Sequence, residues 1–278
     1  PVPDSEARML ELVLSGGLTD WSREWIGTSL AEHPPLDVWL DVAQERGRPI
    51  FWYIPTVEGQ HVILPHLLDR YVQIGVFSDP LVAELLSRRF VAVQAPAAGA
   101  LAKRFSLVPP DFVEPGYLVL SPRGEVLLSV DRAYTFEARP HLELLRGTLA
   151  ALARSARTSD GFRRAHTHWD AKRTVERGLA LGREALLDGE LELAEHVLAQ
   201  TAELDGAGAA VSLVRAVVAR ERRDLEETRA RLDEAEGALD GDSVDERCTL
   251  LAERGILAMR AGDQERARKA FAAGVELE

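Results

Sequence analysis

The chain has 278 residues, enough for one large or two medium domains, and 46% of them are apolar, which is ample for packed cores. Charged residues make up 28%, a share typical of folded proteins rather than disordered ones. No apolar run approaches the ~20 residues of a membrane-spanning helix. Asp4, Glu6 and Glu11 stand where a secretory signal needs positive charge. The compartment stays open, with a soluble, cytoplasmic location favoured.

The net charge of −12 is unevenly distributed. From Ala171 onward there are 24 Asp and Glu residues against 16 Lys and Arg residues. An acidic surface repels phosphate backbones, so nucleic acid is not expected as a partner. Arginine outnumbers lysine by 30 to 3, which we interpret as a genomic composition bias because the arginines are scattered among acids.

The chain contains one cysteine, Cys248. A single thiol cannot form an internal disulfide, act as a dithiol redox couple or supply a cysteine-rich metal site. No cofactor is therefore expected. Within its predicted helix, Cys248 is interpreted as a small buried residue rather than a reactive thiol.

The first part of the chain predicts helices followed by a buried strand. Residues 1–35 read as a helical extension, and apolar residues at helical spacing predict a helix over 36–45. The run Pro49–Ile54 is short, apolar and β-prone, as in a strand that is buried on both faces of a sheet. A further helix is predicted from about 63 to 74.

The next elements complete an α/β pattern. Asp79 and Pro80 form a typical helix start, and Phe90–Gln94 predicts a second buried strand. A short helix near 100–105 precedes two strands, Tyr117–Leu120 and Glu125–Val130, joined by the turn 121–124. With a closing helix over 138–154, this order predicts a mixed sheet flanked by helices.

From about Ala171 the sequence becomes rich in Ala, Leu, Glu and Arg, and a repeat is visible. The segment 183–194 recurs as 256–267, with a middle copy at 219–228. The equivalent turn positions are Gly189, Arg223 and Gly262, so an arginine replaces the turn glycine in the middle copy. Their spacings of 34 and 39 residues are typical of helix-turn-helix repeats, with the polar loop 240–243 lengthening the second.

Residues 36–156 resemble a domain of the thioredoxin superfamily. The resemblance is carried by RPIFWYI, FSDPLVAELLSRRFVAV and EPGYLVLSPRGEVLLSV, in that order. In that family a proline, usually cis, lies beside the active-site cysteines just before a strand-turn-strand. Pro115 stands at that position here, and Gly124 stands in the turn.

The segment where the resemblance places the family's two cysteines has none. It reads Pro55-Thr56-Val57-Glu58-Gly59-Gln60-His61-Val62, with Gly59 and Val62 at the thiol positions. Thiol–disulfide exchange needs a low-pKa thiolate and a second, resolving thiol, so a redox-inactive domain is expected and no catalytic residue is assigned. The vacated cleft is a candidate binding site, and its expected residues are Val57, Glu58, Gly59, Gln60, His61, Glu114, Pro115 and Tyr117.

The segment 172–278 resembles tetratricopeptide repeats (TPR), with about three helix pairs after a linker at 157–171. The resemblance places small residues where paired helices are crowded, and larger core residues opposite them. The small positions are Gly182, Ala216 and Gly255 in the first helices and Ala194, Thr228 and Ala267 in the second, followed by Leu198, Leu232 and Phe271. Such arrays bind peptides or proteins on a concave face.

Two kinds of alternative remain open. Glu58, His61 and Glu114 could do acid–base chemistry in the vacated cleft, as an enzyme or as an accessory subunit of one. A metal or cofactor carrier is the other alternative. His61 and His66 diverge on a helix, however, and His166 and His168 have no third ligand nearby in sequence, so no metal site is assigned.

Together these features predict a non-catalytic scaffold, chaperone-like or accessory protein. Its expected partner is another protein or peptide, bound by the repeats and by the thioredoxin-like cleft.

Overall fold

The structure is a computed structural model, and its chain divides into two compact units between Leu149 and Ala150. We describe each unit by itself. The residues that the structure describes are 36–55, 69, 71–77, 79–95, 97, 99–107, 115–155, 160–239 and 243–277.

The first unit contains a four-stranded mixed sheet with the order β2-β1-β3-β4. The central strand β1 pairs in parallel with β2 and antiparallel with β3, and β3 pairs antiparallel with β4. All five residues of β1 are buried, as predicted for a strand covered on both faces. The strands are β1 (Ile50–Ile54), β2 (Val91–Gln94), β3 (Gly116–Leu120) and β4 (Val126–Val130).

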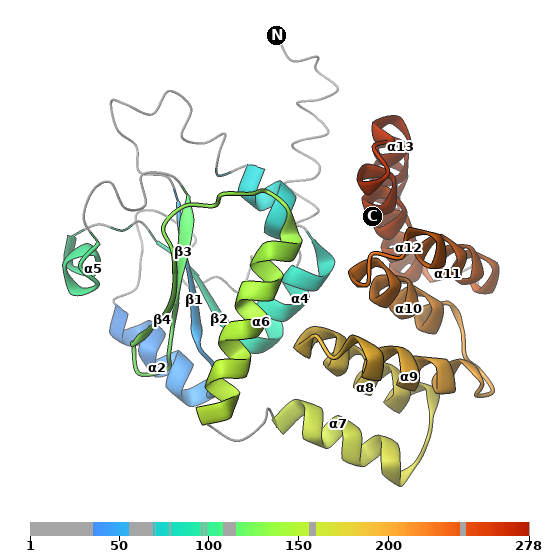
Figure 1. Cartoon of the computed structure of the whole chain (residues 1–278), viewed down its shortest axis with the longest axis horizontal. Coiled ribbons are helices and arrows are strands. Elements are labelled where there is room, and N and C mark those ends of the chain that lie inside the picture. Colours follow the sequence, from blue (N-terminus) through green and yellow to red (C-terminus); the bar gives the residue numbers. More distant parts are fainter. Residues whose placement is uncertain are drawn as a thin grey trace. The chain divides into compact units, whose positions relative to one another are not determined.

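Helices cover both faces of this sheet. Figure 1 shows α4 and α6 on one side and α2 and α5 on the other. The described helices of this unit are α2 (Leu36–Arg46), the π-helix η1 (Gln73–Phe77), α4 (Pro80–Arg89), α5 (Gly99–Arg104) and α6 (Ala138–Ser155). The predicted mixed sheet flanked by helices is therefore confirmed.

The two faces of β1 carry different cores because successive side chains of a strand point to opposite sides. On the α2 side, Trp52 packs against Trp39 and Phe105, and its indole N–H donates to the Ala95 carbonyl at 2.8 Å. On the other side, Phe51 contacts the rings of Phe77, Phe90 and Tyr117. An aromatic cluster thus joins η1 to the sheet.

Local signals set the helix and turn boundaries in this unit. The Asp79 carboxylate accepts from the backbone N–H groups of Leu81 and Val82, and Pro80 occupies the first helical position of α4, as predicted. In the hairpin between β3 and β4, Gly124 has φ +83°, and its N–H donates to the Ser121 carbonyl. Glycine is favoured there because a side chain strains this left-handed backbone.

Of the helix predicted over 63–74, residues 69, 71 and 72 are described as helical, and Gln73 begins a π-helix. Most of that segment lies outside the described residues, and its described end passes into the π-helix η1. A Cβ atom on Gly75 would overlap the Phe136 carbonyl oxygen. Contact with a distant loop therefore accompanies the change in helical geometry, and helical periodicity carries no signal of such a contact.

The second unit is helical, as predicted, and its helices contact one another mainly as α8 with α9, α10 with α11, and α12 with α13. A preceding helix, α7 (Asp160–Ala171), occupies most of the segment that was assigned to the linker. The paired helices are α8 (Val175–Asp188), α9 (Leu191–Ala202), α10 (Ala209–Glu221), α11 (Leu225–Ala238), α12 (Val244–Arg260) and α13 (Gln264–Val275).

Each helix pair is joined by the same turn. Gly189, Arg223 and Gly262 have φ values of +83°, +64° and +78°. Each donates its N–H to the carbonyl three residues earlier, and the next residue donates to the carbonyl five residues before itself. This is the hydrogen-bond pattern of a helix that ends on a left-handed residue. The turn positions expected from the repeat therefore adopt a common left-handed conformation.

The helices of a pair meet where one of them carries little side chain. A Cβ atom added to Gly182 would lie 2.6 Å from Leu198 Cγ, and one on Gly255 would lie 2.5 Å from the Phe271 ring. The other four positions expected to be crowded are all buried, namely Ala194, Ala216, Thr228 and Ala267. Close packing of this kind tolerates little added volume.

Helix α7 packs on the first pair through Trp169. This indole is buried with Leu181 and Val197, and Phe162 and Ala165 pack against the same cluster. Gly178 of α8 lies under it, since a Cβ atom there would come within 2.8 Å of the Trp169 ring and would overlap Thr201 Oγ1. The helix therefore covers one face of α8.

The left-handed turn at Arg223 predicts a stabilising substitution. A non-glycine residue pays about 1 kcal/mol or more in this conformation, so Arg223→Gly is expected to raise the free energy of unfolding by about 1 kcal/mol. Urea denaturation followed by circular dichroism measures the change. The matched control is Gly262→Ala, which should lower the free energy by a similar amount. Equal stability of Arg223→Gly and the parent would contradict this account of the turn.

The contact below Trp169 predicts a destabilising substitution. Gly178→Ala places a methyl group between two buried side chains, and overpacking of this kind is expected to cost about 1–3 kcal/mol. Gly237 of α11 is the control, because nothing lies within 4 Å of an added Cβ there. Gly237→Ala should therefore be neutral or stabilising, by up to about 1 kcal/mol. Thermal melting of both variants tests the difference in sign.

Candidate functional site

The sequence placed a binding cleft at the end of the sheet where β1 ends and β3 begins. Residues 57–61 and Glu114 of that prediction lie outside the described residues. Pro115 and Tyr117 lie within them. Ile54, the last residue of β1, pairs with Gly116, so Pro115 stands beside the point where the chain leaves β1.

The backbone at this end of the sheet is held by the loop that follows β4. The Ala133 N–H donates to the Pro115 carbonyl at 2.8 Å. The Pro115 residue is buried. This bond ties the loop 131–137 to the start of β3, so described residues of the predicted cleft and those of the loop share one edge of the sheet.

Tyr117 points into the core and is 1% exposed. Its hydroxyl lies 2.9 Å from His141 Nδ1, and His141 Nε2 lies 2.9 Å from the Thr135 carbonyl oxygen. A carbonyl only accepts, so Nε2 carries the proton and donates to it, and Nδ1 accepts from the Tyr117 hydroxyl. This assigns the neutral tautomer to His141. The relay joins β3, α6 and the loop 131–137.

Burial sets the protonation of this pair. It raises the pKa of the Tyr117 hydroxyl well above its ordinary value, which keeps this group a donor. Burial also lowers the pKa of His141, and the bond to the Thr135 carbonyl opposes that effect only in part. Sequence reasoning did not single out His141. Its signal was helical spacing, which places it on the same buried face as Ala138 and Leu145.

A second buried tyrosine lies near the same edge. The Tyr53 hydroxyl donates to the Asp69 carboxylate, and Tyr53 stacks edge-on against Phe77. Burial, reinforced by the charge of Asp69, raises the pKa of Tyr53 well above its ordinary range. The bond connects the end of β1 to the chain just before η1.

Exposed aromatic side chains gather on the loop 131–137. Tyr134 is 77% exposed and lies under the Arg132 guanidinium, 5.6 Å from the ring centre. Phe136 stacks on Tyr71, with ring centres 5.4 Å apart, and both are exposed. Large exposed apolar side chains that stand together are typical of surfaces that contact other molecules.

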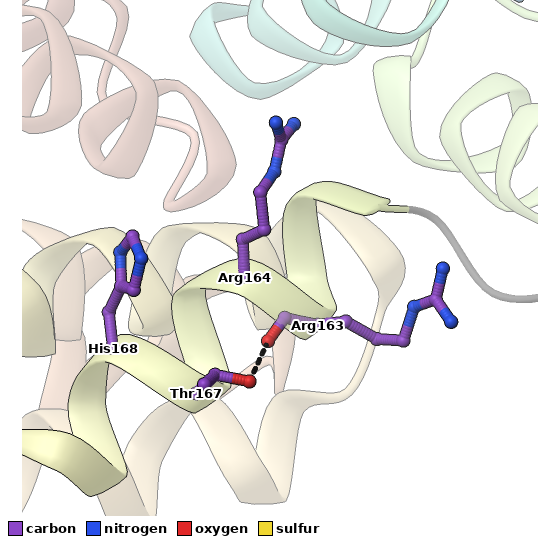
Figure 2. Close-up of a pocket in the computed structure, with 4 residues that line it drawn as sticks. All are labelled: Arg163, Arg164, Thr167 and His168. Carbon is purple, nitrogen blue, oxygen red and sulfur yellow. Dashed lines mark hydrogen bonds between the residues drawn. The ribbon is translucent and has the colours of Figure 1, made fainter.

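The second unit offers a different kind of surface, on α7. Figure 2 shows a hollow beside this helix, lined by Arg163, Arg164, Thr167 and His168. All four side chains are exposed. The Thr167 hydroxyl donates to the Arg163 carbonyl at 2.9 Å, and the Arg164 and His168 side chains project to the same side of the helix.

Two further groups that the sequence singled out have local partners, and His66 lies outside the described residues. His166 Nδ1 lies 3.0 Å from the Asp170 carboxylate, one helical turn away. Cys248 is half-buried, with its sulfur 3.7 Å from the Gly274 carbonyl oxygen. Within the described parts of the chain, no group of three or more His, Cys, Asp or Glu side chains is placed to hold a metal ion.

Comparison with known proteins does not identify a family for this chain. No protein-family model and no curated protein matches the chain. Among the residues that the structure describes, no helix is both long enough and apolar enough to cross a membrane.

The Tyr117–His141 pair predicts a local dependence on pH. Because the folded pKa of His141 lies below its ordinary value of about 6.5, the unfolded chain binds the proton more readily. Stability is therefore retained above about pH 6.5 and falls as the pH is lowered below it. As the pH is lowered from about 7 to about 5, hydrogen exchange of the β3 and α6 amides should become faster, after correction for the intrinsic exchange rate.

The control for this prediction is a pair of substitutions. His141→Gln should make the corrected exchange nearly independent of pH in this range. His196→Gln, at an exposed position of α9, should leave the pH dependence unchanged. An unaltered pH dependence in His141→Gln would show that another group titrates.

Proposed function

We propose that this chain is a redox-inactive thioredoxin-fold protein joined to a TPR-type array, and that it acts as a scaffold or accessory factor by binding another protein. The observation that carries the proposal is the threefold repetition of one helix-pair design. Turn conformation and turn hydrogen bonds recur together at Gly189, Arg223 and Gly262, and buried small residues stand at the matching positions of the helices beside them. Arrays of this kind serve to bind proteins and peptides.

The topology of the first unit supports the thioredoxin-like part of the proposal. A parallel β1–β2 pair continues through β3 into an antiparallel β3–β4 hairpin, and helices lie on both faces. Pro115 stands beside the end of β1, where the resemblance expects the family's proline. With Cys248 as its sole cysteine, the chain lacks the pair of thiols that exchange chemistry requires.

The surface of the second unit supports the binding part. Val244 and Met259 of α12 are large apolar residues that are 47% and 59% exposed. An exposed methionine suits an adaptable binding surface because its side chain is flexible and polarizable. The array thus carries exposed apolar residues on α12, a helix that is packed against α13.

Two measurements on the full chain test this proposal. In a disulfide-reduction assay with insulin as substrate, the rate should not exceed that of the reductant alone, because no dithiol is present. In cell extract, a photoreactive amino acid at position 244 or 259 should cross-link the same partner protein. The control carries the same photoreactive amino acid at position 269 of α13, where the exposed Lys269 is paired to Glu265.

The outcomes separate binding from catalysis. Turnover of insulin above background would overturn the redox-inactive assignment. Cross-links that form equally from positions 244, 259 and 269 would indicate random collision, and they would remove the support for a binding surface on α12.

A further inference from the structure

Over α7 together with the residues that follow it, cations outnumber acids, although the net charge of the whole chain is negative. Five Lys and Arg residues stand against three acids between 160 and 177, while the whole chain has a net charge of −12. One of those acids, Asp170, is paired with His166. We refer to the exposed side chains Arg163, Arg164, Thr167, His168 and Lys172 as the basic face of α7.

The opposite face of the same helix fixes its position. Trp169 is buried against Leu181 and Val197, and Arg173 stacks over the Trp169 ring at 5.5 Å. The Arg177 guanidinium donates to the His168 and Lys172 carbonyls, at 3.0 and 3.5 Å. These bonds cap the end of α7 and hold it on α8, so the basic face is presented from a fixed support.

We propose that the basic face of α7 binds an extended acidic segment of a partner protein. This deepens the proposed function by naming the chemistry of one partner segment. Carboxylates are the groups that guanidinium side chains bind in paired, directional contacts. The surface lies on the helix before the three pairs, separate from α12.

The spacing along the helix matches such a segment. Arg164 and His168 lie four residues apart in α7, about 6 Å along its axis, and Lys172 follows four residues later, just after the helix ends. In an extended peptide, alternate side chains point the same way at intervals of about 6.6 Å. A peptide with acids at every second position therefore matches the spacing of Arg164 and His168 along α7.

The surrounding charge favours a short acidic segment over nucleic acid. The twelve residues of α7 span only about 18 Å, and from Ala171 onward 24 Asp and Glu residues stand against 16 Lys and Arg residues. Repulsion is screened over about 8 Å at physiological salt, so a segment of about six residues stays within the basic face. A nucleic acid strand extends past it and meets like charge.

The test measures fluorescence anisotropy of a labelled Glu-Ser repeat peptide of about six residues, titrated with the full chain. Binding should be saturable and should weaken at least tenfold between about 50 and 500 mM salt. A Gln-Ser peptide of the same length should not bind. The variant Arg163→Glu/Arg164→Glu is expected to weaken binding by about tenfold or more.

Two further variants control for charge and folding. Arg266→Glu/Lys269→Glu in α13 makes the same change in net charge and should leave peptide affinity unchanged. Lys172→Glu, just outside the helix, should weaken binding severalfold by itself. Circular dichroism confirms folding, since Glu and Arg have similar helix propensities.

Several results would overturn the inference. They are no binding of the Glu-Ser peptide by the parent chain, equal loss in the α13 control, and tighter binding of a single-stranded oligonucleotide than of the peptide. Sedimentation that shows self-association through the same arginines would assign the face to a second copy. Any of these outcomes leaves cross-linking from 244 and 259 intact, so failure of this inference is distinct from failure of the proposed function.

Discussion

Two helices approach each other most closely where one of them carries almost no side chain, and two of the three helix pairs of the second unit depend on this constraint. Gly182 receives Leu198 and Gly255 receives Phe271, in both cases with no room for a further carbon atom. The approach is possible because each pair also reverses direction within one left-handed residue. The turn and the contact between the paired helices therefore depend on each other, because the turn sets which residues of the second helix face the glycine of the first.

This coupling explains why the second unit was largely predictable from sequence. Arg223 was expected at a turn from its place in the repeat, although nothing about arginine favours positive φ, and the structure confirms the position. Helix α7 was not predicted, because its apolar residues belong to no repeat copy. Trp169 packs over Gly178, and this contact cannot be predicted from the sequence of either helix alone.

In the first unit, too, contacts between segments that are distant in sequence could not be predicted. β1 and β2 were predicted within a residue or two, because strands buried on both faces read as continuous apolar runs. The π-helix η1 was not, since contact between Gly75 and Phe136 joins segments about sixty residues apart. His141 escaped notice for a related reason, because its partners Tyr117 and Thr135 meet only after the sheet and α6 have packed.

In the described parts of both candidate sites, buried residues hold the backbone and other residues are exposed on the surface. At the sheet edge, the buried relay through His141 holds a loop whose Tyr134 and Phe136 face outward. On α7, Trp169 holds the helix while Arg163 and Arg164 project from it. In both places the residues that fix the backbone differ from the exposed residues beside them. Substitution of the arginines is therefore expected to leave the Trp169 contact intact, whereas a side chain at Gly178 disturbs the contact that holds α7 in place.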